Sequence, residues 1–106
     1  MTQPSAGLHE SRETLQPETV DRHRAIASLM EELEAVDWYD QRVDGAQDPE
    51  LRAILAHNRD EEKEHAAMLL EWLRRHDPAF DKELRTYLFT KKPILEVEEV
   101  ANEPGK

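Results

Sequence analysis

The chain has 106 residues, of which 36% are charged and 38% hydrophobic, and its formal net charge is −10. This length allows one small domain, and the acidic charge argues against nucleic acid and membrane partners and favours the attraction of cations. The absence of cysteine excludes disulfides and thiolate metal sites. Since neither a secretory signal nor a run long enough to span a bilayer is visible, we expect a cytoplasmic protein.

The N-terminal part of the chain predicts a polar segment followed by a long helix. Residues 1–16 are polar, and we expect them to form a segment that is mobile or only locally helical. A helix is predicted from Pro17 to about Asp44, because proline suits a first helical turn and hydrophobic residues then recur at helical spacing. Gly45 is a suitable residue at which to end it.

A second long helix is predicted from Pro49 to about Arg75. Asp48 can cap its first turn and Pro49 suits its first position, while basic residues gather at its end. The connection over residues 45–48 is short, and a short connection between two long helices predicts an antiparallel hairpin.

The rest of the chain predicts a third, shorter helix and a tail. Asp77 and Pro78 repeat the cap-and-proline start, and this helix is predicted to run to about Phe89. Pro93 is expected to end the regular structure, and the acidic residues 91–106 are expected to form a flexible tail. Residues 17–90 then make up the helical body.

These elements predict an all-α fold, an antiparallel two-helix hairpin with a short C-terminal helix. A single layer of helices cannot cover its own apolar face, so we expect the chain to form a homo-oligomer. Two copies of the hairpin would make a four-helix bundle.

Three residues that can bind a metal lie at positions where the core of that bundle should be. Glu62 and His65 lie in the middle of a stripe whose two ends are apolar, formed by Leu51, Leu55, Asn58, Glu62, His65, Leu69 and Trp72. Glu32 lies on the apolar stripe of the first helix. Glu32 and Glu62 are at similar distances from the turn, roughly 20 Å along each helix at 1.5 Å per residue. Buried carboxylates and imidazoles are costly unless something neutralises them, which predicts a metal site.

The donor set indicates the metal. Carboxylate and imidazole ligands suit iron or manganese better than copper(I) or structural zinc. One chain offers two carboxylates and one imidazole. Two chains offer four carboxylates and two imidazoles, and this is the ligand set of di-iron carboxylate bundles. Each residue alone is common on helix surfaces, so the prediction rests on their combination.

Further residues near this stripe allow two interpretations. Tyr39 is either a ligand or donor at the centre, or a packing residue. Glu31 and Glu34 form either a staging site for cations or an ordinary acidic face. His57, Glu61 and Glu64 share a face that binds a metal weakly or forms salt bridges. Arg59 and Lys63 are interpreted as ordinary surface charges.

Two long runs carry a family resemblance. MEELEAVDWYDQR at residues 30–42 and HNRDEEKEHAAM at residues 57–68 strongly resemble the encapsulated ferritins, and EWLRR at 71–75 and RTYLF at 85–89 extend the match over roughly residues 9–90. The resemblance implies a ferroxidase that dimerises around its metal site, assembles into a ring, typically a homodecamer, and is housed in an encapsulin nanocompartment.

The resemblance also implies roles for matching residues. Glu32, Glu62 and His65 would be the ferroxidase ligands, with Tyr39 beside them. Glu31 and Glu34, with Trp38 next to them, would bind incoming cations, and His57, Glu61 and Glu64 would form an outer metal-binding group. Iron would occupy the centre at the dimer interface, and calcium or zinc could bind at the outer acidic sites. Family members carry an apolar motif that docks to the encapsulin shell protein. The nearest candidate here is the run ILEV at residues 94–97.

Two other functions remain open at this point. A rubrerythrin-like peroxidase would use the same di-iron centre for detoxification and would prefer peroxide to dioxygen. A non-catalytic module would bind divalent cations only to assemble. Leucine at positions 62 and 65 would serve a purely structural interface better than glutamate and histidine do.

Overall fold

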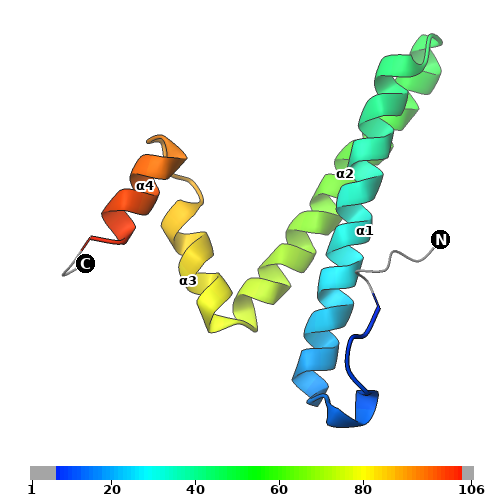
Figure 1. Ribbon diagram of the computed structural model, residues 1–106. Helices are drawn as coiled ribbons and strands as arrows, with labels where there is room; N and C mark the ends of the chain where they lie inside the picture. The colour runs from blue at the N-terminus through cyan, green and yellow to red at the C-terminus, as the bar shows by residue number, and fades with distance from the viewer. Residues whose placement is uncertain (1–6, 104–106) are drawn as a thin grey trace. The chain divides into compact units, whose positions relative to one another are not determined.

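The computed structural model describes residues 7–103, and all the regular structure within them is helical (Figure 1). This confirms the predicted all-α class. The contacts divide the chain into two compact units, Met1–Trp72 and Leu73–Lys106. The predicted mobile segment over residues 1–16 and the predicted tail over residues 91–106 extend beyond the described residues, so their mobility stays a prediction. Within residues 7–103, no helix combines the length and the apolar character that crossing a membrane requires.

The first unit is built on an antiparallel pair of long helices, α1 (Pro17–Gly45) and α2, which begins at Pro49 and ends at Arg75 (Figure 1). A short 3-10 helix, η2 (Arg12–Thr14), precedes them. Pro17 takes the first position of α1 after the extended Gln16, as predicted. Helix α1 includes Gly45, one residue beyond the predicted end, and the backbone N–H of Ala46 closes it by donating to the carbonyl of Arg42.

Side chains fix the turn between the two long helices. The carboxylate of Asp48 accepts a hydrogen bond from the backbone N–H of Leu51 at 2.9 Å, which is the predicted cap of α2. Nε of Arg52 donates to the carbonyl oxygen of Val43 at 3.0 Å, so the start of α2 is tied to the end of α1. These contacts hold the hairpin that places the polar stripes of α1 and α2 at matching heights.

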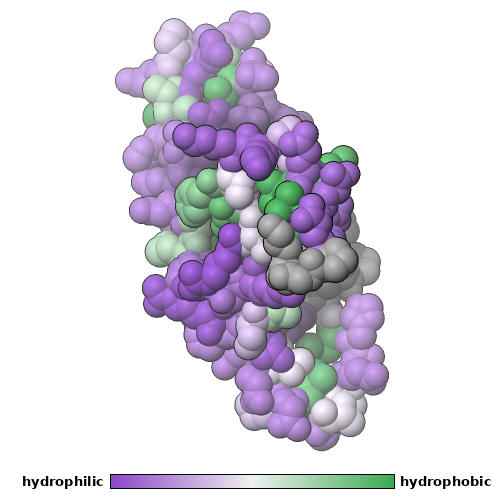
Figure 2. Space-filling model, turned by 90° about the vertical axis from the view of Figure 1, so that its left-hand side faces the viewer, coloured by the Kyte–Doolittle hydropathy of each residue, from purple (hydrophilic) through white to green (hydrophobic). Residues whose placement is uncertain are grey.

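Few side chains of the described residues are buried. The buried hydrophobic residues are Val20, Ala25, Ala66 and Leu73. Several large hydrophobic side chains of α1 and α2 are instead about half exposed, namely Ile26, Leu33, Leu51, Ile54 and Met68. On the face seen in Figure 2, hydrophilic residues predominate and hydrophobic ones gather in patches between them. As the composition predicted, the helices of a single chain leave much of their apolar surface uncovered.

The second unit contains the end of α2, α3 (Pro78–Tyr87) and α4 (Ile94–Ala101). The carboxylate of Asp77 caps α3 by accepting from the backbone N–H of Phe80 at 3.1 Å. Helix α3 ends two residues before the predicted Phe89, because the backbone is already extended at Leu88. Phe89 then takes a positive φ of 62°.

Helix α4 contradicts the expectation that Pro93 ends the regular structure. The carbonyl of Pro93 accepts from the backbone N–H groups of Glu96 and Val97, so the proline starts this helix instead of terminating the fold. Helix α4 packs against α3 and half-buries Val97. Proline lacks a backbone N–H, but the N–H groups at a helix start have no partner within the helix, so nothing is lost there. The fixed φ of proline is also compatible with a helix start.

Candidate metal centre

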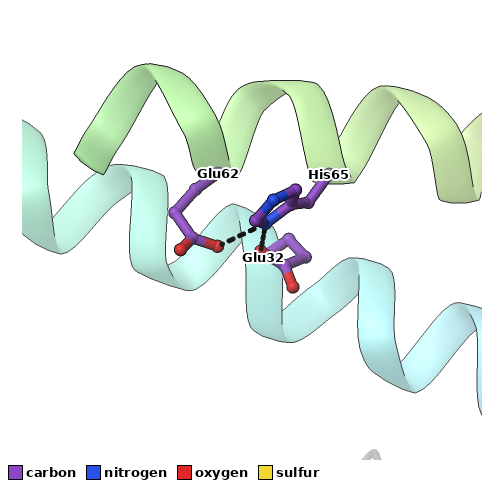
Figure 3. A group of neighbouring side chains, drawn as sticks. All are labelled: Glu32, Glu62 and His65. Carbon is purple, nitrogen blue, oxygen red and sulfur yellow. Dashed lines mark ion pairs between the residues drawn. The ribbon is translucent and has the colours of Figure 1, made fainter. Parts of the chain in front are cut away.

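Three side chains converge between the two long helices (Figure 3). Glu32 projects from α1, and Glu62 and His65 project from adjacent turns of α2. The three-residue spacing of Glu62 and His65 puts them on one face of α2, and the antiparallel hairpin brings Glu32 to the same height. The sequence predicted this combination of residues and their matching height along the hairpin.

His65 lies between the two carboxylates. Its Nδ1 atom is 3.5 Å from Oε2 of Glu32 and 3.5 Å from Oε2 of Glu62. One ligand atom from each of the three residues lies within 4.8 Å of the other two. Within residues 7–103, no other three His, Cys, Asp or Glu side chains approach one another in this way. The three groups are close enough to share one cation.

The site is partly shielded from water. The side chains of Glu32 and Glu62 are 25% and 24% exposed, and that of His65 is 40% exposed. Oε2 of Glu32 is buried and accepts no hydrogen bond. A buried carboxylate oxygen with no hydrogen bond is costly, and a bound cation would satisfy it. The side chains present therefore fit a metal ion, and their oxygen and nitrogen donors suit iron or manganese.

The other predicted residues lie outside this group of three. Tyr39 is half-buried on α1, and the guanidinium of Arg42 stands over its ring at 5.2 Å from the centroid. This contact is a cation–π pair, which accounts for the ring as a packing residue. A role for Tyr39 at the metal stays a prediction.

The acidic pair on α1 is arranged differently. Glu31 is exposed and Glu34 is half-buried, while Trp38 is half exposed on the same helix. Two carboxylates alone are a minimal ligand set, so the predicted cation-binding role of this pair stays a prediction.

The outer group on α2 includes a short contact. Nε2 of His57 lies 2.6 Å from Oε1 of Glu61, and both side chains are largely exposed. Glu64 is also exposed. This pair agrees with the interpretation of the group as surface salt bridges, and its capacity for a metal stays a prediction.

Sequence reasoning missed the role of Arg59. It was interpreted as a surface charge, but its side chain is only 22% exposed, and its Nη1 atom donates to Oδ1 of Asp40 on α1 at 2.9 Å. The alignment that sets Glu32 level with Glu62 leaves Arg59 five residues, or about 7.5 Å, from the level of Asp40, so matching of heights alone did not indicate this pair.

Comparisons with known proteins identify relatives along most of the chain. It is 69% identical over 98 residues to an "Encapsulated ferritin-like protein" of Rhodospirillum rubrum, a match that covers 92% of this chain and 70% of that protein. It is 60% identical over 91 residues to a "Ferritin-like protein" of Thermotoga maritima, covering 86% of this chain and 80% of the relative. A shorter match, 43% identical over 47 residues, joins 44% of this chain to 36% of the "Encapsulin nanocompartment cargo protein EncC" of Myxococcus xanthus.

A solved structure shares the fold. The crystal structure of protein ne0167 from Nitrosomonas europaea matches with a TM-score of 0.80 and 72% identity, covering 83% of this chain and 97% of that one. These matches confirm the resemblance to the encapsulated ferritins that the two sequence runs indicated. The EncFtn-like family model matches residues 7–91, and the chain therefore belongs to the EncFtn-like family.

Proposed function

We propose that this chain is a ferroxidase subunit that binds Fe(II) through Glu32, Glu62 and His65 and oxidises it to Fe(III). The observation that carries the proposal is the convergence of two carboxylates and one imidazole, with Oε2 of Glu32 buried and accepting no hydrogen bond. Membership of the EncFtn-like family supports it, since the relatives are named as ferritin-like proteins.

The proposed centre is shared between two copies of the chain. Two carboxylates and one imidazole are too few ligands for two iron ions. A two-fold axis beside the site would provide four carboxylates and two imidazoles, which is the donor set of di-iron carboxylate bundles. We therefore propose a di-iron centre at a homodimer interface, and further assembly of the dimers into a ring.

The surface of the hairpin supports association. Leu33 on α1 is 54% exposed and Met68 on α2 is 60% exposed, and both lie close in sequence to the candidate ligands. Large apolar side chains left in water favour burial against a second surface. A second hairpin packed on this face would cover them and would bring its own ligands to the site.

Each of the three side chains has a defined part in the proposed reaction. The carboxylates of Glu32 and Glu62 compensate the positive charge of the cation, and Nδ1 of His65 offers a lone pair only when it carries no proton. Two Fe(II) ions would give up one electron each. Together with two protons from water, these electrons would reduce dioxygen to hydrogen peroxide, or hydrogen peroxide to two water molecules, and the Fe(III) ions would leave for mineralisation. The acidic surface, with a net charge of −10, raises the local concentration of Fe(II).

We further propose that the protein is held in an encapsulin nanocompartment. The relatives from Rhodospirillum rubrum and Myxococcus xanthus are named as encapsulated and as nanocompartment cargo. A chain of 106 residues is too small to surround a store of mineral, so a separate shell would have to hold the oxidised iron.

The test is the addition of Fe(II) to metal-free protein in air, with Fe(III) absorbance followed against a protein-free control. Fast oxidation that saturates near two Fe(II) per dimer supports the proposal. Oxidation no faster than the control overturns it, and assembly driven equally by Ca(II) or Zn(II) would then favour a structural module. Oxidation that requires peroxide would favour a rubrerythrin-like peroxidase.

A further inference from the structure

Arg59 connects the two long helices close to the candidate metal centre. It lies on α2, three residues before Glu62, and its side chain is 22% exposed. Its Nη1 atom donates to Oδ1 of Asp40 on α1 at 2.9 Å, and its Nε atom donates to Oδ1 of Asp60 at 3.1 Å. One guanidinium therefore bridges a carboxylate of its own helix and a carboxylate of the other.

This bridge lies between the turn and the metal centre. Asp40 is eight residues beyond Glu32 on α1, and Arg59 is six residues before His65 on α2. At 1.5 Å per residue these separations correspond to roughly 12 Å and 9 Å along the two helices. The bridge therefore joins the two helices about 9–12 Å from the contact of His65 with Glu32.

The register matters because metal sites tolerate little displacement. A slide of one helix by a single residue changes the relative height by about 1.5 Å, whereas ligand distances are held to about 0.2 Å. Apolar contacts between long helices are not directional and resist a small slide only weakly. A hydrogen-bonded arginine–carboxylate pair is directional and fixes the height of one helix against the other.

The bridge also holds the positive charge of the Arg59 guanidinium away from Glu62. Asp60 accepts from Arg59 and lies 3.4 Å from Nζ of Lys63, so the charges near this turn of α2 are paired. Without the hydrogen bond to Asp40, Nη1 of Arg59 would be free to turn toward Glu62, which is three residues away on the same helix. It would then compete with a cation for that carboxylate.

We propose that Arg59 is a positioning residue for the metal centre. Its bridge to Asp40 fixes the height of α1 against α2, so that Glu32 meets Glu62 and His65, and it keeps the guanidinium away from the ligands. This inference rests on the metal centre proposed above, and it assigns to Arg59 no contact with the metal.

The test compares the binding of Co(II) to metal-free protein in the variants Arg59→Lys and Asp40→Asn. Lysine keeps the positive charge, but its single nitrogen atom cannot replace the separate guanidinium nitrogens with which Arg59 binds two carboxylates. We expect each variant to bind Co(II) about 3- to 10-fold more weakly than the wild type, with an altered Co(II) absorption spectrum. The oligomer distribution is checked by sedimentation, so that affinities are compared between equal assemblies.

Two further variants sharpen the comparison. Arg24→Lys is the matched control, because Arg24 pairs with Asp21 at 2.7 Å within α1 and does not join the helices. It should bind Co(II) as the wild type does. The charge-reversed double variant Asp40→Lys with Arg59→Glu restores a salt bridge between the helices, and it should recover part of the lost affinity.

The outcomes separate this inference from the proposed function. If the wild type binds Co(II) but Arg59→Lys and Asp40→Asn bind it within about twofold of the wild type, the positioning role is overturned. A loss as large in Arg24→Lys would overturn it as well. If the wild type itself fails to bind Co(II), the proposed metal centre fails first, and the inference fails with it.

Discussion

Nδ1 of His65 on α2 lies 3.5 Å from Oε2 of Glu32 on α1, across the boundary between the two long helices. The same nitrogen is 3.5 Å from Oε2 of Glu62 on its own helix. One imidazole thus links the carboxylates of both helices, and the ligand set depends on how the hairpin packs. A change at any of the three residues should therefore affect metal binding without requiring loss of the helices.

Glu62→Ala should lose most of the ferroxidase activity. The substitution removes one of the two carboxylates of each chain, and two from a dimeric centre, while alanine favours the helix. We expect the rate of Fe(II) oxidation to fall about tenfold or more, as measured by Fe(III) absorbance. Glu50→Ala, which removes an exposed acid in the first turn of α2, is the control. Oxidation by Glu62→Ala at the wild-type rate would show that the site is wrongly assigned.

Glu32→Leu should stabilise the metal-free protein. Oε2 of Glu32 is buried and accepts no hydrogen bond, and leaving such an oxygen unsatisfied costs about 1–3 kcal/mol. Leucine removes this cost and adds apolar burial, so we expect the free energy of unfolding to rise by about 1 kcal/mol. Urea denaturation of metal-free protein measures it.

The neighbouring residue supplies the control for that experiment. Glu31 is exposed, so Glu31→Leu should change the free energy of unfolding by less than about 0.5 kcal/mol. A metal-free Glu32→Leu protein that is less stable than the wild type would mean that Glu32 serves the fold as well as the site.

Local signals made the helices predictable. Proline at position 17, and aspartate followed by proline at positions 48 and 49, mark helix starts through the fixed φ of proline and the capping oxygen of aspartate. These effects act within one turn and need no knowledge of the tertiary structure. The matching heights of Glu32 and Glu62 then followed from the length of the hairpin.

Contacts between distant residues were harder to predict. Helix α4 depends on packing against α3, and a short segment after a proline gives little sign of such packing. Arg59 was interpreted as a surface charge because arginine on an acidic helix is usually solvated. Its pairing with Asp40 joins residues that are 19 positions apart in the sequence and is evident only in the packed hairpin.

The stability of the second unit should fall in acid through Asp81. The hydrogen bond from Arg74, and then that from Arg85, hold the pKa of Asp81 below its ordinary value. A carboxyl with a depressed pKa in the folded state contributes stability above its unfolded pKa of about 3.9, and this contribution is lost as the pH falls through the folded pKa. Urea midpoints measured from about pH 5 downward should therefore decrease less steeply in Asp81→Asn than in the wild type.

Glu83→Gln is the control for the loss of one negative charge from the same helix, because Glu83 is not among the groups that shift the pKa of Asp81. Its pH dependence should follow the wild type more closely than Asp81→Asn does. Equal slopes in the wild type and Asp81→Asn would show that the pair with Arg74 contributes nothing to the acid sensitivity.

Phe89→Gly should stabilise the protein. Phe89 has a φ of 62°, which is a left-handed backbone conformation. Its side chain is fully exposed, so burial of the ring does not offset the cost of that conformation. That conformation costs a non-glycine residue about 1 kcal/mol or more, because Cβ approaches the following carbonyl. Glycine avoids this cost but loses more entropy on folding. We expect a net gain of about 0.5 kcal/mol in the free energy of unfolding, measured by urea denaturation.

Phe89→Ala is the control for this prediction. It keeps Cβ and its strain, so it should remain less stable than Phe89→Gly. If alanine and glycine give equal stability, the left-handed backbone at this position carries no strain that glycine can relieve.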